Sequence, residues 1–344
     1  MLIGFWCLLV CAYHELATGF LVCTTEGNSS PEFNSFGLGK LLMLKRVIIR
    51  VVVCFGLVMP IQAQTYKGTL GKYPIMLSIQ DDAVSTYMYT RYLKEIPLER
   101  EGYTFYQRYS SKEQKLELFE LRLVGGNLQG TWQNKQRVLP VHLTPVEQSL
   151  ADYRAEHMKF TLVGEKQFAK QTIELIKEDH SNFAFYRLGK GFTQAQQAFL
   201  NPLLAKLHRG YVSNFLQCEE ASYEPQISLV SDEYFSVVIQ YQISCGGPHP
   251  EYGEQMLNFD LSKLAQLHDL TERFPKLDYY SLLKEKYANN NELQAECEYF
   301  ESRDNWAMVK WRLTVDGVII QPYYGHSMAP CEVDFFLSTQ ELND

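Results

Sequence analysis

The residues of this chain that could do chemistry gather in one short loop, Cys-Gly-Gly-Pro-His-Pro at 245–250. The imidazole of His249 changes charge near neutral pH, so it could bind a ligand, act as a base or coordinate a metal. Gly246, Gly247 and Pro248 favour a tight turn, and loops held by such residues often present a binding side chain. The alternative is a structural role, in which His249 hydrogen-bonds its own loop or a neighbouring strand.

A second loop could contribute to the same face, because it contains Tyr323, Tyr324 and His326. Tyrosine suits recognition surfaces, since it combines a large rigid ring with a hydroxyl group. Two histidines and a carboxylate could hold zinc, but no spacing in the sequence requires it, so we predict no metal and no cofactor. The predicted ligand-binding surface consists of Gly246, Gly247, Pro248, His249, Tyr323, Tyr324 and His326.

The rest of the chain contains no complete catalytic motif. Ser281 and Lys284 have the Ser-x-x-Lys spacing of penicillin-binding enzymes. However, the second motif would follow too closely on the same predicted helix, and no Lys-Thr-Gly is present. There is also no Gly-x-Ser-x-Gly, His-Glu-x-x-His, P-loop or dinucleotide fingerprint. We therefore predict that the chain is not an enzyme; the alternative is a hydrolase acting on wall or sugar substrates, with His249 as general base.

The cysteines indicate an oxidising compartment. Of the eight in the chain, four precede residue 63, and the other four form no Cys-x-x-Cys pair. An even number without that pair favours two structural disulfides over zinc or a redox motif. The sequence allows three pairings and does not choose among them; the four residues are Cys218, Cys245, Cys297 and Cys331.

The segment 43–63 has the layout of a secretory signal peptide: a basic start, an apolar run and a small residue at Ala63. The apolar run is shorter than the roughly 20 residues of a membrane-spanning helix. We interpret residues 1–42 as an extension of the gene model and Met43 as the start; the alternative is a retained N-terminal anchor. Cleavage near Ala63 would give a periplasmic or secreted protein.

Residues 64–150 are predicted to form a small β-rich domain, a small antiparallel sheet or a partial barrel. Alternating apolar and polar residues indicate half-buried strands, for example at 86–90 and 116–121. Gly130-Thr131-Trp132 matches the Gly-x-Trp motif of lipocalins, but in lipocalins that motif belongs to the first strand. We interpret Trp132 as a core residue of a small domain.

Residues 151–344 are predicted to form an α+β domain, with an antiparallel sheet and helices packed on one face. Thr193 is a good N-cap for a helix that continues toward Cys218, and 277–287 is an amphipathic helix. A strand meander starts at Ile227 and passes through the 245–250 loop. Asp316-Gly317 supplies the turn of a later hairpin, and residues 332–337 form a last strand.

The net charge of −8 and the absence of a Lys/Arg run argue against a nucleic-acid partner. A mildly acidic surface favours solubility and suits a cationic protein partner.

Four features of residues 168–340 recur together in one known family: the Cys-Gly-Gly-Pro-His-Pro loop, Asn258-Phe259-Asp260-Leu261, the hairpin at 316–320 and the loop ending at Ala329-Pro330-Cys331. In these features the segment resembles the extracytoplasmic C-terminal domain of lysozyme-sensing anti-sigma factors, a module also appended to some peptidoglycan deacetylases. It implies a non-catalytic envelope domain that binds a protein or a wall component. The chain departs from the anti-sigma factors in lacking a sigma-binding segment and a confident membrane helix, so the regulatory role is not carried over. We predict an exported cell-envelope binding protein, whose target is a lysozyme-type muramidase or peptidoglycan.

Overall fold

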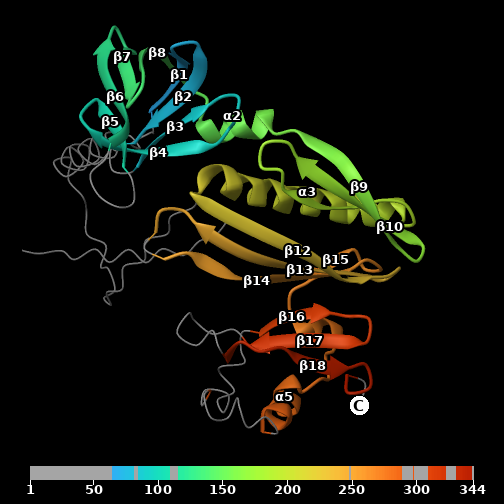
Figure 1. The fold of residues 1–344 in the computed structure, drawn as a ribbon. Helices are drawn as coiled ribbons and strands as arrows, with labels where there is room; N and C mark the ends of the chain where they lie inside the picture. The colour runs from blue at the N-terminus through green and yellow to red at the C-terminus, as the bar shows by residue number, and fades with distance from the viewer. Residues whose placement is uncertain are drawn as a thin grey trace, which may run out of the picture. The chain divides into compact units, whose positions relative to one another are not determined.

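The structure, a computed structural model, describes residues 64–80, 84–108, 115–247, 249–288, 297, 309–322 and 331–342. These residues belong to one unit, Ile61–Asp344. They form antiparallel sheets with a few helices, which confirms the predicted α+β class (Figure 1). The predicted signal peptide and N-terminal extension lie outside the described residues.

The N-terminal part of this unit is a closed barrel of eight antiparallel strands in sequence order. The first strand, β1, pairs with β2 on one side and with β8 on the other, so the sheet has no free edge. The predicted sheet or partial barrel is therefore a complete barrel. Its strands are β1 (Gln64–Leu70), β2 (Tyr73–Ile79), β3 (Ser85–Tyr89), β4 (Glu95–Glu101), β5 (Thr104–Arg108), β6 (Lys115–Val124), β7 (Asn127–Asn134) and β8 (Val138–Val146).

The barrel interior is packed with aromatic and aliphatic side chains from alternate strand positions, as the period of two along a strand requires. Tyr87 and Phe119 meet edge to face with ring centroids 5.0 Å apart. Trp132 is buried in the same cluster, which agrees with its interpretation as a core residue. The indole Nε1 of Trp132 donates to Oε2 of Glu117 at 3.3 Å, and the Tyr87 hydroxyl donates to the same oxygen.

After the barrel, the chain forms helix α2 (Leu150–His157) and a three-stranded sheet of β9 (Phe160–Phe168), β10 (Gln171–Glu178) and β11 (Ala184–Leu188). Ser149 caps α2, because its hydroxyl accepts from the backbone N–H of Asp152 at 3.0 Å.

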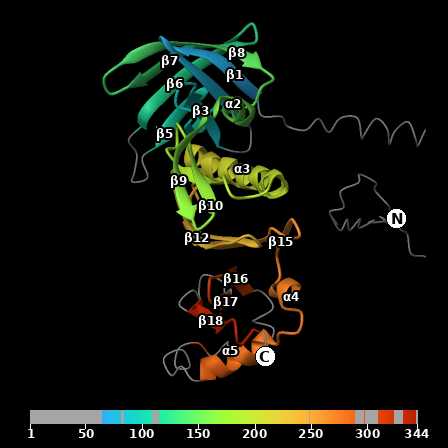
Figure 2. The ribbon, with the colours of Figure 1, turned by 90° about the vertical axis from the view of Figure 1, so that its right-hand side faces the viewer.

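Helix α3 (Gln194–Gln217) begins at the predicted N-cap, Thr193, which forms a reciprocal capping box with Gln196. It is followed by a four-stranded sheet of β12 (Glu220–Val230), β13 (Tyr234–Ser244), β14 (Glu251–Asp260) and β15 (Ala265–Leu267). Figure 1 shows α3 between this sheet and the β9–β11 sheet, and Figure 2 shows α3 above the β12–β15 sheet. The aromatic side chains of the three elements form one core, including Phe183, Phe185, Tyr211 and Tyr223.

A last three-stranded sheet contains β16 (Val309–Leu313), β17 (Gly317–Pro322) and β18 (Phe335–Ser338), and it shares a core with α4 (Leu270–Arg273) and α5 (Tyr279–Ala288). The buried side chain of Asn258 joins β14 to β16. Its Nδ2 donates to the carbonyl of Trp311 at 2.7 Å, and its Oδ1 accepts from the N–H of Leu313 at 2.9 Å. The Asp316-Gly317 turn lies where the sequence predicts it.

Helix α3 carries a buried histidine, His208, whose protonation makes the stability of the protein depend on pH. His208 is buried among Phe160, Phe183 and Phe185, and one ring nitrogen lies 3.3 Å from the Phe183 carbonyl oxygen. Burial lowers the pKa of His208 from 6.5 to about 4. Between these values the unfolded chain binds the proton more strongly, so stability falls as the pH falls from 6.5 toward 4.

We expect His208 to contribute a loss of about 2 kcal/mol in the free energy of unfolding between pH 7 and pH 5. Urea denaturation at the two pH values measures the total change. The His208→Leu variant removes the titrating group and should lose correspondingly less stability over the same interval. An equal loss in both proteins would show that His208 does not contribute.

Candidate functional site

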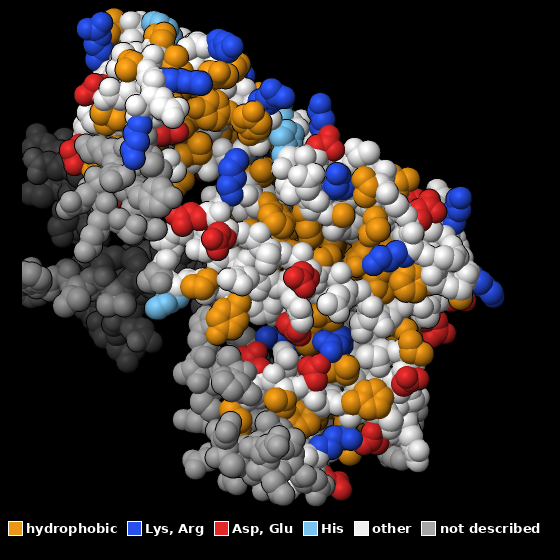
Figure 3. Space-filling view, in the orientation of Figure 1, with side chains coloured by type: hydrophobic (Ala, Val, Ile, Leu, Met, Phe, Trp, Pro, Cys, Tyr) orange, Lys and Arg blue, Asp and Glu red, His pale blue; other side chains and the backbone are white. Residues whose placement is uncertain are grey.

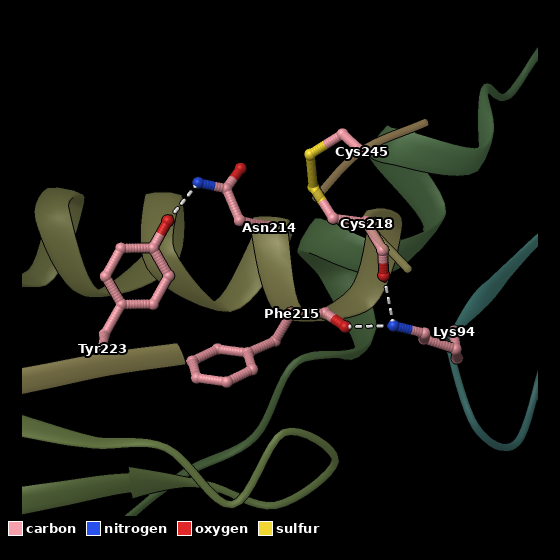
Figure 4. The surroundings of a disulfide bond; sticks show 6 residues. All are labelled: Lys94, Asn214, Phe215, Cys218, Tyr223 and Cys245. Atoms are coloured by element: carbon pink, nitrogen blue, oxygen red, sulfur yellow. Dashed lines mark hydrogen bonds between the residues drawn. A yellow bond between two sulfur atoms is a disulfide. The ribbon is translucent and has the colours of Figure 1, made fainter. Parts of the chain in front are cut away.

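The structure selects one of the three disulfide pairings that the sequence allows, and the prediction of two disulfides is confirmed. Cys218 bonds to Cys245, and Cys297 bonds to Cys331. The first bond ties the end of α3 to the loop between β13 and β14 (Figure 4). The second closes the C-terminal core, where both cysteines are buried. Two disulfides are compatible with an extracytoplasmic location.

The Cys218–Cys245 bond fixes one end of the loop that carries the predicted site. Gly246 adopts φ +85°, a left-handed conformation that glycine reaches without strain. Gly246, Gly247 and His249 are exposed. His249 forms no hydrogen bond or ion pair with any residue that the structure describes. The binding role of His249 stays a prediction.

The other members of the predicted surface are Pro248, Tyr323, Tyr324 and His326, and they lie outside the described residues. Their proximity to His249 therefore stays a prediction. Among the residues that are described, there is no group of three or more His, Cys, Asp or Glu side chains that could hold a metal ion.

Lys94 lies beside the Cys218–Cys245 disulfide. It is not among the site residues that the sequence predicts. It precedes β4 of the barrel, and its Nζ donates to the carbonyl oxygens of Phe215 at 2.8 Å and Cys218 at 2.5 Å (Figure 4). These carbonyls belong to the C-terminal turn of α3, where a cation is favoured by unpaired backbone acceptors and the helix dipole. Burial lowers the pKa of Lys94, while the neighbouring Glu219 acts in the opposite direction.

A groove of about 770 Å³ borders this loop, and we call it the disulfide groove. Its charged lining consists of one cation, Lys94, and three carboxylates, Glu95, Glu99 and Glu219. With three carboxylates against one ammonium group, the lining carries an excess of negative charge. The residues that line the groove are Val84, Thr86, Lys94, Glu95, Ile96, Pro97, Leu98, Glu99, Gln107, Gln217, Glu219, Cys245 and Gly246.

No sequence signal identifies the disulfide groove, because its two walls come from segments more than 100 residues apart. Lys94 and Phe215, for example, are separated by 121 positions. In the sequence, Lys94 is an isolated lysine before a strand, which is typical of a surface residue. Only the tertiary fold places the α3 carbonyls beside it.

One further observation concerns the charge of the surface, and another concerns the helices. On the face shown in Figure 3, basic and acidic side chains of the described residues are interspersed, and no extended basic patch is visible. None of the helices in the described part of the chain combines the length and the apolar character needed to cross a membrane.

Comparison with known proteins identifies structural neighbours only. No protein-family model matches the chain, and no curated protein matches it. A DUF3298 family protein from Pseudomonas aeruginosa PAO1 is 14% identical with a TM-score of 0.29, and the match covers 54% of this chain and 90% of that protein. A DUF3298 family member from Bacteroides fragilis NCTC 9343 is 16% identical with a TM-score of 0.34, covering 54% and 92%.

DUF3298 denotes a domain of unknown function, so these neighbours name no activity. The TM-scores are low, and the likeness supports no inference about a ligand. The specific resemblance to anti-sigma factors is not confirmed by them.

Proposed function

We propose that the chain is an exported, non-catalytic binding protein of the cell envelope, and that its partner docks on the 245–250 loop and the disulfide groove. The partner would be a wall-degrading enzyme such as a lysozyme-type muramidase, or peptidoglycan itself. The observation that carries the proposal is the exposed His249 loop, which is anchored by Cys218–Cys245 beside a groove lined by three carboxylates. A pre-ordered loop favours binding because less conformational entropy is lost on association.

The charge of the groove favours a cationic protein over a neutral polymer. Glu95 is paired with Arg154, but Glu219 is exposed at the rim, beside Lys94. The whole chain has a net charge of −8. Complementary charge accelerates association and makes it sensitive to salt.

A catalytic role for His249 is the competing interpretation. A general base is normally held by a second group that sets the orientation of its ring. His249 has no hydrogen-bonding partner within the described residues, so the geometry supports presentation of the ring to a partner better than proton abstraction.

The test is calorimetric titration of the purified, disulfide-bonded chain with a lysozyme-type muramidase at low and high salt. We expect saturable one-to-one binding that weakens as salt is added. The combined His249→Ala and Glu219→Gln variant should bind about tenfold more weakly, because it loses an exposed contact and a complementary charge. Its melting temperature should be unchanged, since both residues are exposed.

Glu165→Gln removes an exposed carboxylate on β9, outside the groove, and is the matched control that should bind as tightly as the parent. Equal binding by the parent, the double variant and the control would show that the partner binds outside the 245–250 loop and the disulfide groove. No heat at micromolar concentrations would remove the muramidase from consideration and direct the search to peptidoglycan fragments.

A further inference from the structure

A second cleft, of about 940 Å³, lies on the outer wall of the barrel. Its walls come from β1, β2, β3 and β4, from the end of β8, from the start of α2 and from the last residue of α3. This volume is in the range of small-molecule sites. We call it the polar cleft.

Side-chain amides and hydroxyls dominate the polar lining of this cleft. The amides are Gln64, Gln80 and Gln217, and the hydroxyls include Thr65, Ser78 and Thr86. Thr65 is 5% exposed and Ser78 is 7% exposed. Neither of these two side chains hydrogen-bonds to any residue that the structure describes. Their hydroxyl oxygens are not among the buried, unpaired polar atoms of the described residues, so they are open to the cleft and can bind a ligand that enters it.

The charges of the lining point to an uncharged ligand. Glu95 is held by the guanidinium of Arg154, and Glu147 is exposed. Among the described residues that line the polar cleft there is no Lys, Arg or His. An anionic ligand would meet no cation here. A cationic ligand would find Glu95 already neutralised and would gain only a weak, solvent-exposed ion pair with Glu147.

The closed barrel argues against a peptide as the ligand. An extended peptide binds most readily by adding a strand to an open sheet edge. The wall strand β1 is paired on both sides, with β2 and with β8, so it offers no such edge. Recognition must then come from side chains. Pro145, Val146 and Leu150 add apolar surface to the lining, which suits the apolar faces of sugar rings.

We propose that the polar cleft binds a neutral oligosaccharide that carries hydroxyl and acetamido groups. The amides of the lining can both donate to and accept from such groups, and the hydroxyls of Thr65 and Ser78 supply two more partners in the wall of the cleft. The polar cleft adjoins the disulfide groove and shares Thr86, Glu95 and Gln217 with it, but the proposal does not rest on the binding of a protein there.

The test is an NMR titration of the purified, disulfide-bonded chain with tri-N-acetylchitotriose as the probe. We expect saturable shifts of backbone signals on β1, β2 and α2. Thr65→Val keeps the side-chain shape and removes the hydroxyl, so it should weaken binding about fivefold, the effect of one lost hydrogen bond. Thr131→Val makes the same change at an exposed position on β7 and should bind like the parent.

Three results would overturn the proposal: no saturation at millimolar sugar, equal binding by the Thr65→Val variant and the parent, or saturable binding of a neutral peptide but not of the sugar. Muramidase titration of the same Thr65→Val variant separates the two sites. An unchanged muramidase affinity together with a weakened sugar affinity assigns the sugar to the polar cleft alone.

Discussion

Alanine at Gly68 is expected to lower the free energy of unfolding by more than about 4 kcal/mol, because it disrupts the seam that closes the barrel. Gly68 pairs with Leu143 of β8, and this β1–β8 pairing joins the two ends of the barrel sheet. A Cβ atom at Gly68 would lie 2.0 Å from the carbonyl oxygen of His142 and 2.9 Å from the Cα of Leu143. Both atoms belong to the backbone, so the strands would have to separate.

Gly210→Ala is the matched control. It lies inside α3, is exposed, and an added Cβ meets nothing within 4 Å. Alanine there should stabilise the chain by about 0.5–1 kcal/mol, since glycine loses more backbone entropy in a helix. Thermal melting by circular dichroism compares the two variants. A melting temperature for Gly68→Ala that equals the parental value would show that the seam tolerates a side chain.

Leucine at Arg154 is expected to lower the free energy of unfolding by about 4 kcal/mol, because it leaves a carboxylate without its cation. Arg154 of α2 forms an ion pair with Glu95 of β4, and their side chains are 2% and 14% exposed. Removing one partner from a buried pair is more costly than removing both, since the remaining charge keeps its desolvation penalty.

The double variant Arg154→Leu with Glu95→Leu is therefore expected to recover most of the lost stability. A double-mutant cycle by urea denaturation, completed with Glu95→Leu alone, measures the coupling energy. Additive effects of the two single changes would show that the pair contributes nothing beyond its separate side chains. The cycle also reports whether α2 is attached to the barrel through this contact.

Local features of the fold could be predicted from neighbouring residues. The α3 N-cap at Thr193 and the turn at Asp316-Gly317 lie where they were expected, because a cap and a tight turn depend on a few consecutive residues. The burial of Trp132 also agreed with the prediction. The short helix at Leu270–Arg273 has no periodic signal in the sequence, since one turn of helix is too short to show periodicity.

The closure of the barrel could not be predicted in the same way. Each strand has an alternating pattern, but that pattern is the same in an open sheet and in a barrel. Closure is decided by the pairing of β1 with β8, whose partners Thr65 and Val146 are far apart in the sequence. Close approach of the backbones at Gly68 permits that pairing.

The candidate sites likewise combine features that neighbouring residues predict with features that depend on distant segments. Residue types and their local order can be read from the chain alone: a cysteine, two glycines and a histidine in a turn, a net negative charge, and four cysteines suited to two disulfides. The pairing of the cysteines, the contact of Lys94 with the end of α3 and the ion pair of Glu95 with Arg154 depend on the tertiary fold. Turns, caps and alternation are properties of adjacent residues, whereas disulfide pairing, buried ion pairs and clefts require distant segments that come together only in the folded core.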